Sequence, residues 1–183
     1  MSLIPTASQT VGPFFNFALT NDRSLGVLAR EGTEGERIRL TFRVVDGDGA
    51  PTPGDSMIEL WQADARGRYA EVGHSFCGFG RLETDLQGEC VFETVKPGPV
   101  PDGRGGMQAP HVNVTVFARG LLRHLYTRVY FEGEPANACD AVLALVPEER
   151  RGTLLARQVA GRANEWWFEI RLQGQAETVF FDL

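Results

Sequence analysis

The chain has 183 residues, 43% of them hydrophobic and 23% charged, which suits one globular domain with a substantial core. Its formal net charge of −6 argues against a nucleic-acid partner and against an anionic membrane surface. The 21 Gly and 10 Pro residues predict many turns, which favours a β-rich fold over a helical bundle.

Residues 1–35 are rich in loop-forming residues, and they predict an N-terminal arm with one short helical turn near residues 21–30. The first strand follows directly, because apolar side chains occupy every second position and Arg or Thr stands between them. The apolar positions are Ile38, Leu40, Phe42 and Val44. The turn sequence DGDG comes next, so we expect a half-buried strand that ends in a tight turn.

Six further segments are rich in β-branched and aromatic residues and are separated by Gly and Pro turns. They cover residues 57–64, 88–95, 111–118, 122–131, 165–173 and 177–183. Residues 137–157 have the only sustained helical character, and Pro147 divides them into two short helical pieces at most. The sequence therefore predicts a mainly β fold, an antiparallel β-sandwich over residues 36–183 with short helices.

The three cysteines, Cys77, Cys90 and Cys139, are odd in number and widely spaced, and no C-x-x-C motif occurs. Neither a disulfide framework nor a zinc knuckle is predicted. The first residues, MSLIPTASQTVGPFF, lack the basic and apolar regions of a secretion signal, and no run of about eighteen apolar residues occurs. These features predict a reduced, cytoplasmic protein.

The segment HVN places His111 and Asn113 on one face of a predicted strand, because strand side chains alternate between two faces. Two histidines in that arrangement could bind one metal ion, but an amide is a poor ligand for a transition metal. A single strand histidine is more often a neutral, hydrogen-bonded residue than a ligand. Neither His74 nor His124 stands at a ligand spacing from His111.

Two other side chains have both a structural and a functional interpretation. Tyr69 ends the dense segment IELWQADARGRY, where it either caps a loop or belongs to a site. Arg128 lies in the apolar strand LYTRVYF. It is either a surface arginine with a buried stem or a fixed cation for a carboxylate, since its fork of donors matches that group.

Six motifs follow one another along the chain in an order and spacing that resemble the intradiol ring-cleaving dioxygenases. They are SQTVGPFF, IELWQADARGRY, GFGRLETDLQGECVFETVKPGPVP, APHVNVTVFARG, LYTRVYF and IRLQGQAETVFFDL. The resemblance runs over nearly the whole chain. It implies an antiparallel β-sandwich, in agreement with the strand pattern, and a reaction in which O₂ opens an aromatic diol between its hydroxyl groups.

In that family a catalytic chain holds ferric iron with two tyrosines and two histidines, a donor set that suits this hard cation. The resemblance places Tyr69 and His111 at two of the four ligand positions, but it places Val100 and Asn113 at the other two. Gln108 stands where the histidine motif of the family has an arginine. Loss of half the donors implies a remnant site that holds no metal, and therefore no catalysis by this chain alone.

The same departures resemble the non-catalytic alpha type of chain, which pairs with a catalytic beta chain in the two-chain members of the family. The resemblance then implies ferric iron in the beta subunit and a higher αβ oligomer. It implies that Thr10, Gly12, Pro13 and Phe14 reach the partner's substrate pocket, with Gly12 and Pro13 fixing a turn. Arg128 would attract the carboxylate of a small aromatic substrate.

Two alternatives stay open. The chain could be a self-sufficient iron dioxygenase in which His74 or His124 replaces the lost ligands. It could also be a non-catalytic β-sandwich binding module that acts alone as a stable monomer.

Overall fold

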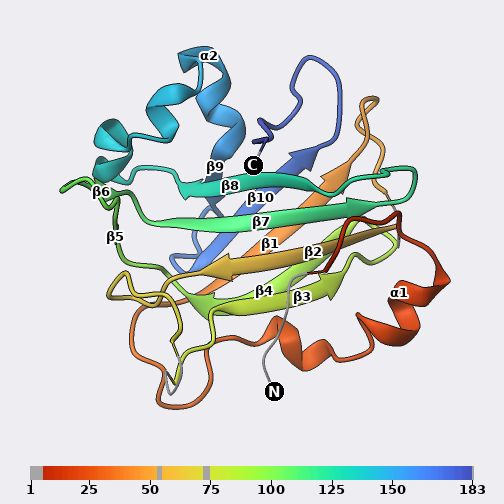
Figure 1. The fold of residues 1–183 in the computed structure, drawn as a ribbon, viewed down its shortest axis with the longest axis horizontal. Helices are drawn as coiled ribbons and strands as arrows, with labels where there is room; N and C mark the ends of the chain where they lie inside the picture. The colour runs from red at the N-terminus through yellow and green to blue at the C-terminus, as the bar shows by residue number, and fades with distance from the viewer. Residues whose placement is uncertain (1–5, 53–54, 72–74, 183) are drawn as a thin grey trace.

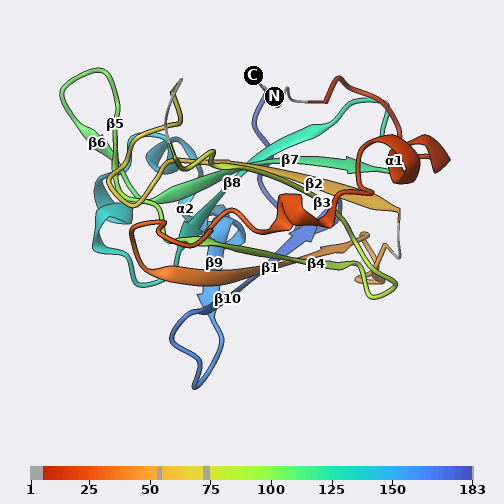
Figure 2. The same cartoon turned by 90° about the horizontal axis from the view of Figure 1, so that it is seen from below.

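Two layers of β-strands make up most of the molecule, as Figure 1 and Figure 2 show. The computed structural model describes residues 6–52, 55–71 and 75–182. Its strands are β1 (Arg37–Val45), β2 (Ser56–Gln62), β3 (Phe79–Glu83), β4 (Glu89–Val95), β5 (Val100–Pro101), β6 (Met107–Gln108), β7 (His111–Ala118), β8 (Leu125–Phe131), β9 (Leu155–Gln158) and β10 (Glu165–Arg171). The helical segments are α1 (Pro13–Ala18), η1 (Arg23–Gly26), η2 (Pro135–Cys139), η3 (Leu143–Leu145), α2 (Glu148–Arg151) and η4 (Gly152–Leu154). The prediction of a mainly β fold with short helices is confirmed.

Eight of the strands form one hydrogen-bonded sheet, in the order β3-β2-β7-β8-β9-β10-β1-β4, which folds over on itself. β9 is the link, because it pairs with β8 of one layer and with β10 of the other. Figure 2 shows β7 and β8 in the upper layer and β1 and β4 in the lower one. The predicted sandwich is thus confirmed, but it is not wholly antiparallel, since the β1–β10 and β8–β9 ladders are parallel.

The core lies between the two layers. The alternation expected for β1 is confirmed, because Ile38, Leu40, Phe42 and Val44 are at most 2% exposed. The ring of Phe42 contacts those of Phe92 and Phe168 edge-on, with centroids 5.7 and 6.0 Å apart. Val112, Val114 and Val116 of β7 belong to the same cluster. The side chains between these valines therefore point to the outer face of their layer.

The N-terminal arm leads to α1, which lies at one end of that outer face (Figure 1). Phe15 is 3% exposed and packs on Phe117 with ring centroids 5.9 Å apart. Gly12 is the N-cap of α1 and Pro13 its first residue, a position where proline costs no hydrogen bond. The sequence predicted only a turn here, whereas the apolar contact of Phe15 supports a six-residue helix.

The strand predicted at residues 177–183 is wrong. Within the described part of this segment, residues 177–182, one isolated bridge forms, between Tyr126 and Phe181. The backbone N–H of Arg171 donates to Thr178 Oγ1, and the N–H of Thr178 donates to the carbonyl oxygen of Arg171. The segment therefore turns back onto the end of β10 instead of extending a ladder.

Residues 137–157 also differ from the prediction of two helical pieces at most. The structure has η2, η3, α2 and η4 over this region, followed by the start of β9. The carboxylate of Asp140 accepts the backbone N–H groups of Val142 and Leu143, which separates η2 from η3. Pro147 is the N-cap of α2 rather than a break within a helix. Strands β3, β5, β6 and β9 were not predicted, and in β3 the alternation is interrupted by Gly80.

The three cysteines are free thiols. Cys77 and Cys139 are exposed, whereas Cys90 is buried, and burial raises the pKa of its thiol. In the described part of the chain, no helix has the length and apolar character needed to cross a bilayer.

Candidate functional site

His111 and Asn113 lie at the start of β7 on the outer face of their layer, because Val112 between them points into the core. The prediction that the two side chains share one face is confirmed. His111 is only 1% exposed, so its ring nitrogens must find partners within the protein.

Tyr69 supplies one of those partners. Its hydroxyl oxygen lies 3.3 Å from His111 Nε2 and 2.8 Å from Asn113 Nδ2. His111 Nδ1 lies 2.7 Å from the carbonyl oxygen of Ala109, which can only accept, so Nδ1 carries the ring proton. Nε2 is then the acceptor to which the Tyr69 hydroxyl donates, while the Asn113 amide donates to the Tyr69 oxygen. The Tyr69 hydroxyl thus donates one hydrogen bond and accepts another, which links the three side chains.

A tight turn carries Tyr69 to this place. Asp64 Oδ1 accepts two backbone N–H groups of the turn, at 2.8 and 2.9 Å. Gly67 has a φ of 77°, and a Cβ at this position would collide with the carbonyl oxygen of Pro99. Trp61 stacks on the ring of Tyr69, with centroids 5.9 Å apart and an interplanar angle of 11°. The phenol is thus positioned by both backbone and ring contacts.

Arg128 lies on β8, directly opposite Asn113 in the antiparallel ladder. Its Nη1 donates to Gln108 Oε1 at 2.7 Å, and Gln108 pairs with Val100 in the β5–β6 hairpin. All the positions singled out by the resemblance for a metal site therefore meet here, together with one arginine. We call this set the β7 cluster: Tyr69, Val100, Gln108, His111, Asn113 and Arg128.

Burial sets the protonation states within the β7 cluster. It lowers the pKa of His111 to about 4, and the positive charge of Arg128 acts in the same direction. Burial also raises the pKa of the Tyr69 hydroxyl. At neutral pH the imidazole is therefore neutral and the phenol protonated, and these are the states that the hydrogen bonds between them require.

The β7 cluster does not fit ferric iron. The lone pair on His111 Nε2 that a metal would take accepts the Tyr69 proton instead. Asn113 turns an amide N–H toward the phenol, and Val100 has no donor atom. More widely, no group of three or more His, Cys, Asp or Glu side chains in residues 6–52, 55–71 and 75–182 could hold a metal ion.

The structure does not bring His124 to the β7 cluster. Its ring packs on Phe117, near the opposite end of β7 from His111. Its Nδ1 lies 3.0 Å from Ser8 Oγ, and its Nε2 lies 2.6 Å from the Tyr126 hydroxyl. The other histidine of the self-sufficient alternative, His74, lies outside the described residues.

The arm residues also lie away from the β7 cluster of their own chain. Thr10 Oγ1 accepts the backbone N–H of Gly120, at 2.9 Å, in the turn between β7 and β8. Phe14, beside Gly12 and Pro13 at the start of α1, is 64% exposed. An aromatic ring is thus presented outward at this end of the layer.

A buried ion pair that the sequence pattern did not predict lies on the same face. Glu59 and Arg81 are 3% and 8% exposed, and Arg81 Nη2 lies 2.7 Å from Glu59 Oε1. The Thr6 hydroxyl donates to the same carboxylate oxygen at 2.6 Å, which ties the arm to the sheet. The available signal was a charged residue inside each of two otherwise largely apolar segments, Glu59 in MIELWQ and Arg81 in FGRLE, and these two positions pair across β2 and β3.

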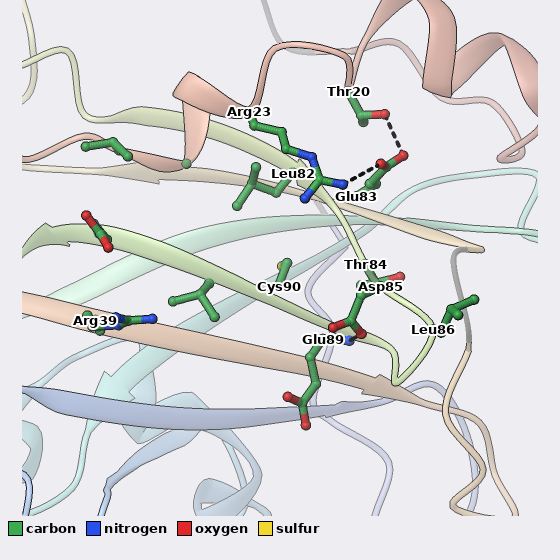
Figure 3. Close-up of a pocket in the computed structure, with 14 residues that line it drawn as sticks. Thr20, Arg23, Arg39, Leu82, Glu83, Thr84, Asp85, Leu86, Glu89 and Cys90 are labelled. Atoms are coloured by element: carbon green, nitrogen blue, oxygen red, sulfur yellow. Dashed lines mark hydrogen bonds and ion pairs between the residues drawn. The ribbon is translucent and has the colours of Figure 1, made fainter.

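A groove of about 630 Å³ opens between η1, β3 and β4, and Figure 3 shows its lining. Glu83 accepts the Thr20 hydroxyl at 2.9 Å and lies 3.5 Å from Arg23 Nη2. Asp85, in the β3–β4 turn, and Glu89, at the start of β4, add further carboxylates. The lining shares no residue with the β7 cluster, so groove and cluster are separate features.

Comparison with known proteins finds similarity along the whole chain. A family model described as Dioxygenase matches residues 10–174. A protocatechuate 3,4-dioxygenase alpha chain from Burkholderia cepacia is 44% identical, over 100% of this chain and 99% of its own length. A protocatechuate 3,4-dioxygenase beta chain from the same organism is 35% identical, over 79% of this chain and 67% of its own length.

A solved structure has a similar fold. It is the dioxygenase domain of a dioxygenase–carbohydrate-binding protein fusion from Streptomyces sp. SirexAA-E. Its TM-score is 0.66 at 28% identity, and the match covers 93% of this chain and 99% of that domain. The similarity therefore extends from the sequence to the arrangement of the strands.

Proposed function

This chain belongs to the intradiol ring-cleaving dioxygenase family, and we propose that it is the alpha chain of a protocatechuate 3,4-dioxygenase that works with a catalytic beta chain. The enzyme opens the ring of protocatechuate between its two hydroxyl-bearing carbons. Both atoms of O₂ enter the product, 3-carboxy-cis,cis-muconate. Ferric iron belongs to the beta chain, and the two chains assemble into a higher αβ oligomer in the cytoplasm.

The state of the β7 cluster is the observation that carries this proposal. Of the four ligand positions that the resemblance implies, one holds Val100, which has no donor atom, and another holds Asn113, whose amide is a poor ligand for ferric iron. The two donors that are present, Tyr69 and His111, are hydrogen-bonded to each other. A chain that bound iron by itself would need these lone pairs for the metal. The full-length similarity to an alpha chain supports the same role.

The contribution of this chain to the reaction comes from its arm. We include Thr10, Gly12, Pro13 and Phe14 as part of the substrate pocket in the beta chain. Two observations support this: the hydroxyl of Thr10 is held by a backbone N–H, and the ring of Phe14 is 64% exposed at the start of α1. A hydroxyl held in this way needs little ordering when substrate binds.

Arg128 belongs to the proposal as a cation that draws the substrate carboxylate. A guanidinium has five N–H donors, and Gln108 accepts from one of its nitrogens. Replacing Arg128 with Met is expected to raise KM for protocatechuate much more than KM for an uncharged catechol. Equal rises in KM for the two substrates would show that Arg128 does not interact with the substrate carboxylate.

The central experiment compares this chain purified alone, with iron supplied, and the same chain co-expressed with its beta chain. The lone chain is expected to be colourless, free of iron and inactive. The complex is expected to hold iron and to cleave protocatechuate. Stoichiometric ferric iron in the lone chain, with a visible tyrosinate absorption band and oxygen consumption, would overturn the proposal.

A further inference from the structure

Arg128 places a positive charge beside the β7 cluster. It stands directly opposite Asn113 in the β7–β8 ladder, and Asn113 Nδ2 lies 2.8 Å from the Tyr69 oxygen. Facing side chains in such a ladder begin about 5 Å apart at their Cβ atoms. The Arg128 side chain therefore begins beside that of Asn113, and its positive charge acts on both Tyr69 and His111.

The guanidinium is held in this position. Its Nη1 lies 2.7 Å from Gln108 Oε1, and Gln108 is itself fixed by its pairing with Val100 across the β5–β6 hairpin. An arginine stays charged throughout the physiological pH range, so it cannot relieve a repulsion by losing a proton. The charge also acts within the cluster, because it is one of the causes that lower the pKa of His111.

We propose that Arg128 excludes metal cations from the β7 cluster, so that the missing donors at Val100 and Asn113 are only one of two barriers to iron. This inference goes beyond the alpha-chain assignment and does not depend on it. A trivalent cation beside a fixed guanidinium meets a repulsion that grows as the site is withdrawn from water. Restoring the lost ligands while the guanidinium remains would therefore leave a weak site.

The test compares two variants of the full chain, Val100→Tyr/Asn113→His and Val100→Tyr/Asn113→His/Arg128→Gln. Each is incubated with ferric citrate, passed through a desalting column, and measured for bound iron and for a visible phenolate-to-iron absorption band. We expect iron to bind at least about tenfold more tightly when Arg128 is replaced. Equal iron binding by the two folded variants would overturn the proposal.

A second matched pair guards against misfolding caused by a tyrosine at the buried position 100. It consists of Asn113→His and Asn113→His/Arg128→Gln, titrated with Co²⁺ and followed by the cobalt absorption spectrum. The control is Asn113→His/Arg157→Gln, which removes the same charge from an exposed position on β9. Tighter Co²⁺ binding only when Arg128 is replaced supports the proposal. A similar gain with the Arg157 control, or no gain with either, would overturn it.

Discussion

Replacing Tyr69 with Phe separates a hydrogen-bonded remnant from a metal site, because the two interpretations assign opposite roles to one oxygen atom. In the structure this oxygen receives the Asn113 amide at 2.8 Å and donates to His111 Nε2 at 3.3 Å. Phe keeps the ring that stacks on Trp61 but leaves a nitrogen of His111, a residue 1% exposed, without its partner. We expect a loss of about 1–2 kcal/mol in the free energy of unfolding.

For a chain of 183 residues this loss corresponds to a fall of about 3–6 °C in the unfolding midpoint. Calorimetry of the full chain measures it. Tyr126→Phe is the matched control, because its hydroxyl contacts His124 at 2.6 Å in a half-exposed position, where water can take over the bond. The control is expected to lose less than about 0.5 kcal/mol.

The same variant is then assembled with the beta chain. Iron per αβ pair and kcat are expected to stay within about twofold of the unaltered complex, since no reacting atom in the proposed site is touched. Loss of iron or of the visible absorption band in a folded Tyr69→Phe complex would refute the remnant interpretation. An unchanged unfolding midpoint would refute the hydrogen-bond argument.

Three further predictions concern stability. Lowering the pH from 7 to 4 should cost about 3 kcal/mol through His111, because its pKa is about 4 in the folded chain and about 6.5 in the unfolded one. Over most of this pH range the unfolded chain therefore binds the proton and the folded chain does not. Urea titrations across this range should show a shallower pH slope for His111→Gln, and an unchanged slope would contradict the assignment. Glu59→Gln removes the carboxylate that pairs with the buried Arg81 and should cost about 3–5 kcal/mol in the same assay. A cost below about 1 kcal/mol would count against a buried pair. Phe15→Ala should lower the free energy of unfolding by about 3–5 kcal/mol, because this side chain is buried. Phe17→Ala, at a side chain that is 76% exposed, should change it by less than about 0.5 kcal/mol. Equal losses for the two variants would show that α1 does not bury the face that carries Phe15.

Most strands could be predicted from the sequence because their information is local. Alternation of apolar and polar residues over a few positions decided β1, and the same pattern located β7, whose bounds of His111–Ala118 agree with the prediction. The strand prediction was wrong where the hydrogen-bond partners of a segment lie far away in the sequence. Residues 177–182 have strand composition, yet they bond back to β10 through Thr178 and form no ladder.

The sequence by itself, through its resemblance to the family, predicted which side chains stand at the ligand positions: Val100 has no donor atom, and Asn113 offers only an amide, a poor ligand for a ferric ion. Only the tertiary structure decided what the remaining groups do instead. Tyr69 and His111 are 42 residues apart in the chain, and their hydrogen bond exists because a Gly67 turn and β7 meet in space. The place of Arg128 beside Asn113 likewise follows from the register of β7 against β8. Pairings of this kind depend on the summed packing of two layers, which no short stretch of sequence encodes.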